Sequence, residues 1–262
     1  MTNIKHTLLG AALCVASAAG SATTVYSNDF QTGFGSEWST NFGGGLGLDN
    51  VPADANRLFL GRNDDVATLG FSNDVVKLSL AGLGAHNKVT VSFDVYVINS
   101  WDGNGPLGNF PCCGPDMFGV SLANVTPGSA SGLLTTFSNL NAGEHPDAPP
   151  EGALQSYPNA FPNLPGSAPF SGAAEVGTLG YDFFGGGVGD DDSVYRISLT
   201  FDHSVSSLEL SFFALGLQDL TDESWGLDNV TVSTAAVPLP APFLLLGASV
   251  FGLLGVRRRK IR

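Results

Sequence analysis

The fold is decided by the stretch Lys88-Val89-Thr90-Val91-Ser92-Phe93-Asp94-Val95-Tyr96-Val97-Ile98. Its odd-numbered positions from 89 to 97 are all apolar, while Thr90, Ser92 and Asp94 lie between them. Such a period of two is typical of a β-strand with one buried face. The same alternation recurs in residues 195–201 and 208–212.

Weaker strand candidates are spread along the rest of the chain between glycine-rich turns. They are residues 58–60, 75–80, 117–122, 133–137 and 226–232. No long helical period appears outside the two termini. The pattern predicts an all-β, jelly-roll-type antiparallel β-sandwich. Residues 102–115 and 141–174 interrupt it as proline- and glycine-rich loops.

The charge distribution limits the partners of this sandwich. All 24 Asp and Glu lie between Asp29 and Asp228, where only five Lys and Arg oppose them, giving this region a formal charge of −19. A surface this acidic repels nucleic acid and anionic lipid and attracts divalent cations. We therefore expect no nucleic-acid partner.

The N-terminus has the order of a secretory signal. Lys5 and His6 precede the apolar residues 7–18, and the small residues Gly20, Ser21 and Ala22 follow. This order predicts a signal peptide over residues 1–22 with cleavage near Ala22, in preference to a buried N-terminal helix. Residues 23–236 would then be the exported domain.

The C-terminus has the order of a membrane anchor. Residues 237–256 span 20 positions of mainly apolar character, and the basic tail of residues 257–262 follows directly. A stretch of that length is about the minimum for a transmembrane helix. Basic residues stay on the cytoplasmic side, so the domain of residues 23–236 would be extracytoplasmic.

This tail resembles the PEP-CTERM family of bacterial sorting signals, in its VPLPA variant. The resemblance rests on an apolar span between two groups of residues, which are Val237, Pro238, Leu239, Pro240 and Ala241, and then Arg257, Arg258 and Arg259. It implies an exosortase-type sorting protease as a partner. It also implies membrane anchoring before processing, and a final place at the cell surface or in an exopolysaccharide or biofilm matrix. Leu239 stands where the parent motif has Glu.

Asp228 is a candidate metal ligand. It shares a strand face with Val230 and Val232, so it points toward the core unless a bulge follows Asp228. A buried carboxylate needs hydrogen-bond donors or a cation, and Ca²⁺ prefers oxygen ligands. The alternative is an Asx-type turn, in which Asp228 accepts backbone N–H bonds.

The two ends of the domain also resemble carbohydrate-binding-module and lectin-like jelly rolls. The resemblance rests on Asn28-Asp29-Phe30 at the start and on residues 225–230, Trp-Gly-Leu-Asp-Asn-Val, at the end. It implies a structural Ca²⁺ between the first and last strands, with Asp29 and Asp228 as ligands. The pentapeptide of residues 226–230 also occurs at residues 47–51, which we interpret as a turn-plus-strand coincidence.

Trp101, Asp102 and Asp116 are candidate ligand-binding residues, since they flank or lie in the loop of residues 102–115. An exposed aromatic face suits the apolar side of a sugar ring, and carboxylates suit its hydroxyls. Packing in the core is the open alternative for Trp101 and the expected one for Trp38 and Trp225.

Two further motifs are ambiguous. Cys112 and Cys113 are adjacent, and an exported chain would form a vicinal disulfide or pair them with another chain. Residues 186–193 nearly match a calcium-binding nonapeptide of β-rolls. The motif occurs once, so we expect a solvated acidic turn with weak Ca²⁺ affinity.

Enzyme signatures are missing from the sequence. His86, His145 and His203 are isolated, and neither His-Glu-x-x-His nor Gly-x-Ser-x-Gly occurs. The sequence predicts an exported, noncatalytic, surface- or matrix-associated protein that binds polysaccharide and holds structural calcium. The alternatives are a glycan-active hydrolase, for which the many carboxylates leave room, and a purely structural, adhesive or ice-binding protein. Ice binding would need a flat array of regularly spaced Thr, which the predicted strands lack.

Overall fold

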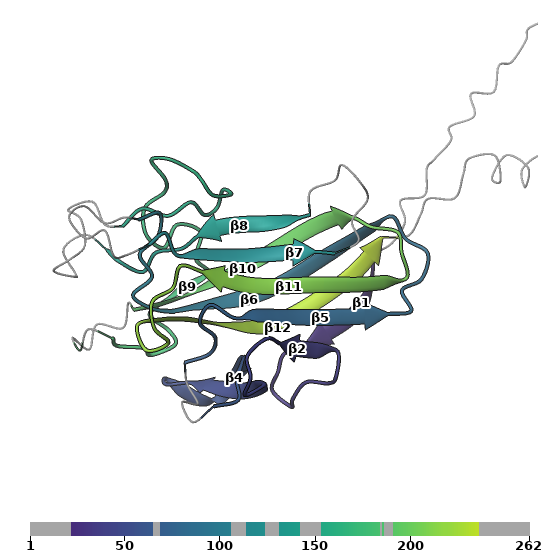
Figure 1. The fold of residues 1–262 in the computed structure, drawn as a ribbon, viewed down its shortest axis with the longest axis horizontal. Coiled ribbons are helices and arrows are strands. Elements are labelled where there is room, and N and C mark those ends of the chain that lie inside the picture. The colour runs from purple at the N-terminus through teal and green to yellow at the C-terminus, as the bar shows by residue number, and fades with distance from the viewer. Residues whose placement is uncertain are drawn as a thin grey trace, which may run out of the picture.

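The computed structural model describes residues 22–64, 69–105, 114–123, 131–141, 153–183, 185 and 191–235. Two antiparallel sheets pack face to face, which confirms the all-β sandwich (Figure 1). Within the residues that the structure describes, no helix is long and apolar enough to span a bilayer. The predicted signal peptide, except Ala22, and the whole predicted sorting tail lie outside the described residues.

The larger sheet has the strand order β3-β4-β12-β6-β10-β9, and β1 pairs with β12 beside β4. Its strands are β1 (Ala22–Asn28), β3 (Leu46–Val51), β4 (Asp54–Arg62), β6 (Lys88–Asn99), β9 (Glu175–Val176), β10 (Asp192–Asp202) and β12 (Glu223–Ala235). The smaller sheet has the order β2-β5-β11-β7-β8. Its strands are β2 (Trp38–Thr40), β5 (Val75–Ala81), β7 (Met117–Leu122), β8 (Gly132–Thr136) and β11 (Ser207–Leu215). In Figure 1 the smaller sheet lies in front of β6, β10 and β12.

The alternation in β6 places one face of that strand in the core. Val89, Val91, Phe93, Val95 and Val97 are all buried in the cluster between the sheets. The Phe93 ring lies 5.1 Å from Phe212 of β11 and 6.1 Å from Phe118 of β7, measured between ring centroids. Burial of each such side chain stabilises the fold by roughly 1.5–3 kcal/mol.

A bulge in β12 decides where Asp228 points. Asp228 pairs with Asp94 and Thr231 with Ser92, so Asn229 and Val230 together oppose a single residue of β6. Asn229 has φ 52°, a left-handed conformation that Asn tolerates better than most residues. The bulge reverses the side-chain alternation, so Asp228 lies on the outer face of the sheet while Val230 lies in the core. The predicted shared face of Asp228, Val230 and Val232 was therefore wrong.

The larger sheet curls strongly at one end. Arg57 of β4 and Glu175 of β9 are separated by three strands, which is about 19 Å in a flat sheet, yet their side chains form an ion pair at 2.9 Å. A second, smaller core lies on the outer face at this end. Its residues are Val51, Phe59, Tyr96, Ile98, Leu179, Tyr181 and Val194. Among the described residues, this second core covers the outer face at that end.

Other segments differ from the prediction in detail. β1 ends at Asn28, and Phe30 has φ 53° with its ring fully buried, so Asp29 and Phe30 form a turn after the strand. The described part of the long proline-rich loop packs onto the sandwich, since the Tyr157 ring lies 5.1 Å from that of Tyr195. The strands β1, β2 and β3 are short or polar and carried no alternating signal.

Candidate functional site

Three carboxylates converge at one end of the sandwich. Asp102 follows β6, Asp116 precedes β7, and Glu223 is the first residue of β12. Each offers an oxygen that lies within 4.8 Å of the others, and all three residues are buried. Asp102, Asp116 and Glu223 are called the acidic cluster below.

Backbone and side-chain hydrogen bonds fix the positions of these carboxylates. The Asp102 backbone N–H donates to Asp116 Oδ2, and the Asp116 N–H donates to Gly103 O at 3.0 Å. The Gln218 N–H donates to Glu223 Oε2 at 2.8 Å. Asp116 Oδ1, in a residue that is 0% exposed, has no hydrogen-bond partner among the described residues. This oxygen is the feature that distinguishes the cluster from an ordinary set of loop carboxylates.

The cluster has a strongly unfavourable charge balance. Burial and the nearby Asp116 raise the pKa of Glu223 to about 11. Burial and the nearby Asp102 raise the pKa of Asp116 well above its ordinary value. The five Lys and Arg of the domain pair with other carboxylates, as Arg57–Glu175, Arg62–Asp74, Lys77–Glu209, Lys88–Asp202 and Arg196–Glu175. Three converging carboxylate oxygens are a donor set for a hard cation.

Two of the three predicted ligand-binding residues thus belong to the acidic cluster, and the third does not face solvent. Trp101 is 0% exposed, and its Nε1–H donates to Ser224 O at 2.9 Å. Core packing is therefore the alternative that the structure supports for Trp101. Trp38 and Trp225 are buried as well. Sequence reasoning missed Glu223, because it lies three residues before the closing strand predicted over residues 226–232, whereas β12 begins at Glu223 itself.

The structure does not bring the predicted calcium ligands Asp29 and Asp228 into the acidic cluster. Asp29 is exposed, and its Oδ1 accepts the Gln31 N–H. Asp228 accepts the Tyr96 hydroxyl and the Asn229 N–H, both at 2.7 Å. Burial raises the pKa of Asp228 to about 6, and the Tyr96 hydrogen bond opposes that shift. Asp228 is thus satisfied by one side-chain donor and one backbone donor, although the backbone N–H is that of the next residue and not the one two positions on that an Asx turn uses.

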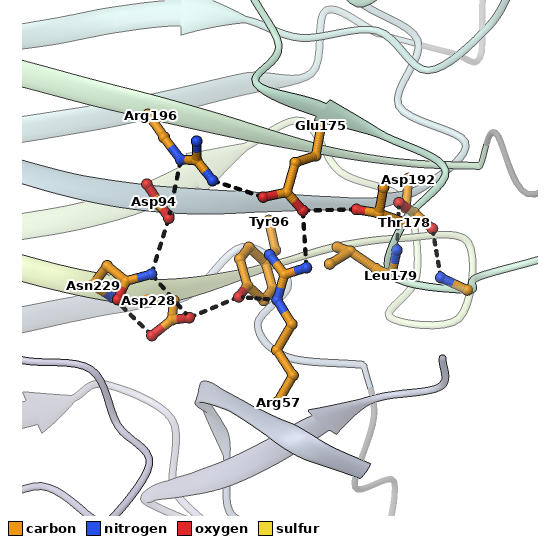
Figure 2. Close-up of polar contacts among 11 residues, drawn as sticks. Arg57, Asp94, Tyr96, Glu175, Thr178, Leu179, Asp192, Arg196, Asp228 and Asn229 are labelled. Atoms are coloured by element: carbon orange, nitrogen blue, oxygen red, sulfur yellow. Dashed lines mark hydrogen bonds and ion pairs between the residues drawn. The ribbon is translucent and has the colours of Figure 1, made fainter. Parts of the chain in front are cut away.

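A second group of polar side chains lies on the outer face of the larger sheet (Figure 2). It is called the polar network below and consists of Arg57, Asp94, Tyr96, Glu175, Arg196, Asp228 and Asn229. Figure 2 shows these residues converging from β4, β6, β9, β10 and β12.

Two arginines organise the polar network. Arg57 Nε donates to the Tyr96 hydroxyl oxygen at 2.8 Å, and Arg57 Nη1 donates to Glu175 at 2.9 Å. Arg196 Nη2 donates to Glu175 Oε1 at 2.7 Å, and Arg196 Nε lies 3.7 Å from Asp94 Oδ2. Burial would raise the pKa of Glu175, but the Arg57 hydrogen bond and both arginine charges lower it. The ionised form of Glu175 is therefore stabilised, whereas that of Glu223 is destabilised.

Hydroxyl groups continue the outer face away from the polar network. Thr90 and Thr200 are hydrogen-bonded at 2.9 Å, and so are Ser92 and Ser198. Across β12, Thr231 pairs with Ser92 and Ser233 with Thr90. These two hydroxyl rows mix Ser with Thr, so they differ from the regular Thr array that ice binding would need.

Two smaller expectations are corrected by the structure. Asp192, in the predicted solvated acidic turn, is fully buried and accepts the N–H groups of Leu179, Gly180 and Tyr181. His86 and His203, which look isolated in the sequence, lie with Nε2 and Nδ1 2.7 Å apart. Residues 186–190 of that turn, together with Cys112 and Cys113, lie outside the described residues.

No protein-family model and no curated protein matches this sequence. Among solved structures, the chain is similar to the K1 cleaved adhesin domain of Lys-gingipain from Porphyromonas gingivalis W83, at 13% identity over 83% of this chain and 100% of that one, with a TM-score of 0.38. It is similar to the CBM22-1 xylan-binding domain from Paenibacillus barcinonensis Xyn10C, at 16% identity over 85% and 99%, with a TM-score of 0.32. It also matches an exo-beta-1,3-galactanase from Phanerochaete chrysosporium at 9% identity over 82% of this chain, and it spans 29% of that chain, with a TM-score of 0.31. TM-scores this low do not transfer a function.

Proposed function

We propose that this chain is an exported, noncatalytic, jelly-roll-type module that binds polysaccharide through the outer face of its larger sheet. The observation that carries the proposal is the polar network beside the two hydroxyl rows. Together they place fixed donors and acceptors along one sheet face whose other end is covered by the second core.

The chemistry of this face suits sugar hydroxyls. A sugar hydroxyl both donates and accepts, and Arg, Asp and Asn supply planar sets of donors and acceptors that match neighbouring hydroxyls. The Arg196 side chain is 61% exposed although Glu175 holds it in place. Preorganised polar groups lose less entropy when a ligand binds. Because the three tryptophans are buried, recognition on this face would rest on hydrogen bonds and not on ring stacking.

The proposal also includes a cellular localisation, which rests on the sequences of the two termini. A signal peptide over residues 1–22 would export the domain, and residues 237–256 would anchor it in the membrane with residues 257–262 on the cytoplasmic side. An exosortase-type protease would then process the tail and release the module to the cell surface or the extracellular matrix.

A glycan array probed with the full-length chain in detergent tests the proposed binding. We expect wild type to bind a class of polysaccharide, and Arg196→Met to reduce the affinity at least tenfold. Lys77→Met is the matched control, because Lys77 forms a similarly exposed ion pair with Glu209 in the smaller sheet. Binding to no glycan, or equal loss in both variants, contradicts the proposal. Release of reducing ends by wild type would favour the hydrolase alternative.

A further inference from the structure

We propose that Asp102, Asp116 and Glu223 hold a divalent cation, with Ca²⁺ as the expected ion, and that this ion links the two sheets. The proposal is independent of polysaccharide binding. It assigns the predicted calcium to the acidic cluster in place of Asp29 and Asp228. It rests on Asp116 Oδ1, which belongs to a fully buried residue and has no hydrogen-bond partner in the part of the chain that the structure describes.

The spacing of the three carboxylates fits one ion. Calcium binds oxygen ligands at 2.3–2.6 Å, so two ligands of the same ion lie at most about 5 Å apart. The ligand atoms of the acidic cluster lie within 4.8 Å of one another. An unpaired buried carboxylate is costly, and a cation removes that cost for all three groups at once.

The donor set selects the kind of metal. All three side chains offer carboxylate oxygen, which favours Ca²⁺, Mg²⁺ or Mn²⁺ over the metals that prefer imidazole or thiolate. Mg²⁺ usually keeps several water ligands, whereas Ca²⁺ accepts an irregular set of protein oxygens. Burial of the whole cluster therefore favours Ca²⁺.

The position of the cluster indicates what the ion does. Asp102 and Glu223 adjoin β6 and β12 of the larger sheet, while Asp116 adjoins β7 of the smaller sheet. An ion bound by all three residues would fasten the sheets together at this end. The role is structural, and its loss lowers the stability of the native state.

A bound proton is the alternative to a metal ion for reducing the negative charge of the acidic cluster. Asp116 and Glu223 can share one proton between their carboxyl groups, because oxygens of the two side chains lie within 4.8 Å of each other and both residues are buried. The two solutions differ in their response to metal. A proton-sharing pair is indifferent to calcium, whereas a cation site exchanges its protons for the ion.

The test is thermal unfolding of the full-length chain in detergent, stripped with EDTA and then titrated with Ca²⁺ or Mg²⁺. At a hundredfold excess over Kd, we expect Ca²⁺ to raise Tm by roughly 5–10 °C, and Mg²⁺ to raise it less. Binding of Tb³⁺, read by luminescence sensitised through the adjacent Trp101, reports the same site directly and needs no variant.

Two variants locate the ion. Asp116→Asn should lose the calcium-induced shift in Tm, yet in EDTA it should be at least as stable as wild type, since an amide carries no charge to bury. Asp29→Asn is the matched control and should keep the full shift. Glu223→Gln repeats the test should Asp116→Asn fold poorly. A wild-type Tm that ignores calcium, or a shift that survives in both cluster variants, overturns the proposal.

Discussion

The acidic cluster and the polar network are two carboxylate sites built on the same strands, β6 and β12, and they solve the problem of charge in different ways. In the polar network, Arg57 and Arg196 lie 2.9 and 2.7 Å from Glu175 and keep its pKa low. In the acidic cluster, burial and the neighbouring Asp116 and Asp102 raise the pKa of Glu223 to about 11. A chain with five Lys and Arg in its domain thus neutralises one site internally, while the other depends on a proton or a metal ion from outside.

The largest effect on the free energy of unfolding is expected at Trp101, next to the acidic cluster. Trp101→Ala should lower the free energy of unfolding by about 3–5 kcal/mol, because the indole is fully buried beside Asp102 and its removal leaves a cavity. Urea unfolding measures the change. Phe183→Ala, which truncates a ring that is 41% exposed, is the control and should change stability little. A cost under about 1 kcal/mol for Trp101→Ala would contradict core packing.

The two sites should respond to pH in opposite directions. Glu223 holds a proton in the folded state far above its ordinary pKa of 4.5. In EDTA, stability should therefore fall as pH rises from 5 to 8, by about 1.4 kcal/mol per pH unit for each extra proton held by the folded state. Glu175 has a lowered pKa, so its contribution is present above pH 4.5 and is lost as pH falls below it.

Glu223→Gln separates these two contributions. The variant should flatten the decline in metal-free stability between pH 5 and 8 and leave the loss at acidic pH in place. Unfolding free energies measured at several pH values, with EDTA present, supply the comparison. An unchanged slope in the variant would show that Glu223 is not the group that holds the proton.

A smaller effect is expected in the polar network. Arg57→Met should cost about 1–2 kcal/mol, since it removes one cation from Glu175 and a donor from the Tyr96 hydroxyl, in a partly buried setting. The loss should be the same with and without calcium, because the network supplies its own cations. A calcium-dependent cost would mean that the two sites are coupled.

The smallest effect is expected for an ion pair that is half exposed to solvent. Lys88 and Asp202 form an ion pair in which both side chains are 51% exposed. Lys88→Met should change stability by less than about 0.5 kcal/mol, because solvent screens such a pair. Chemical denaturation in low and high salt measures it, and a cost comparable to that of Arg57→Met would contradict the ranking.

Much of the fold could be predicted because alternation is a local property. The strands around residues 88–98, 195–201 and 208–212 were visible, since each alternates apolar and polar side chains over the core. β1, β2 and β3 were missed because their side chains are mostly polar or only partly buried. For the site, Asp102 and Asp116 were selected for the wrong reason, namely their nearness to a tryptophan that is in fact buried.

The sequence by itself determined the sandwich, the acidic character of the domain and the scarcity of cations, because periodicity and composition need no partner residues. Tertiary structure alone decided that Asp228 faces outward, since the bulge at Asn229 appears only when β12 is paired with β6. It also decided that Glu223 joins Asp102 and Asp116. These residues come from distant parts of the chain, and only the pairing of strands brings their carboxylates within 4.8 Å.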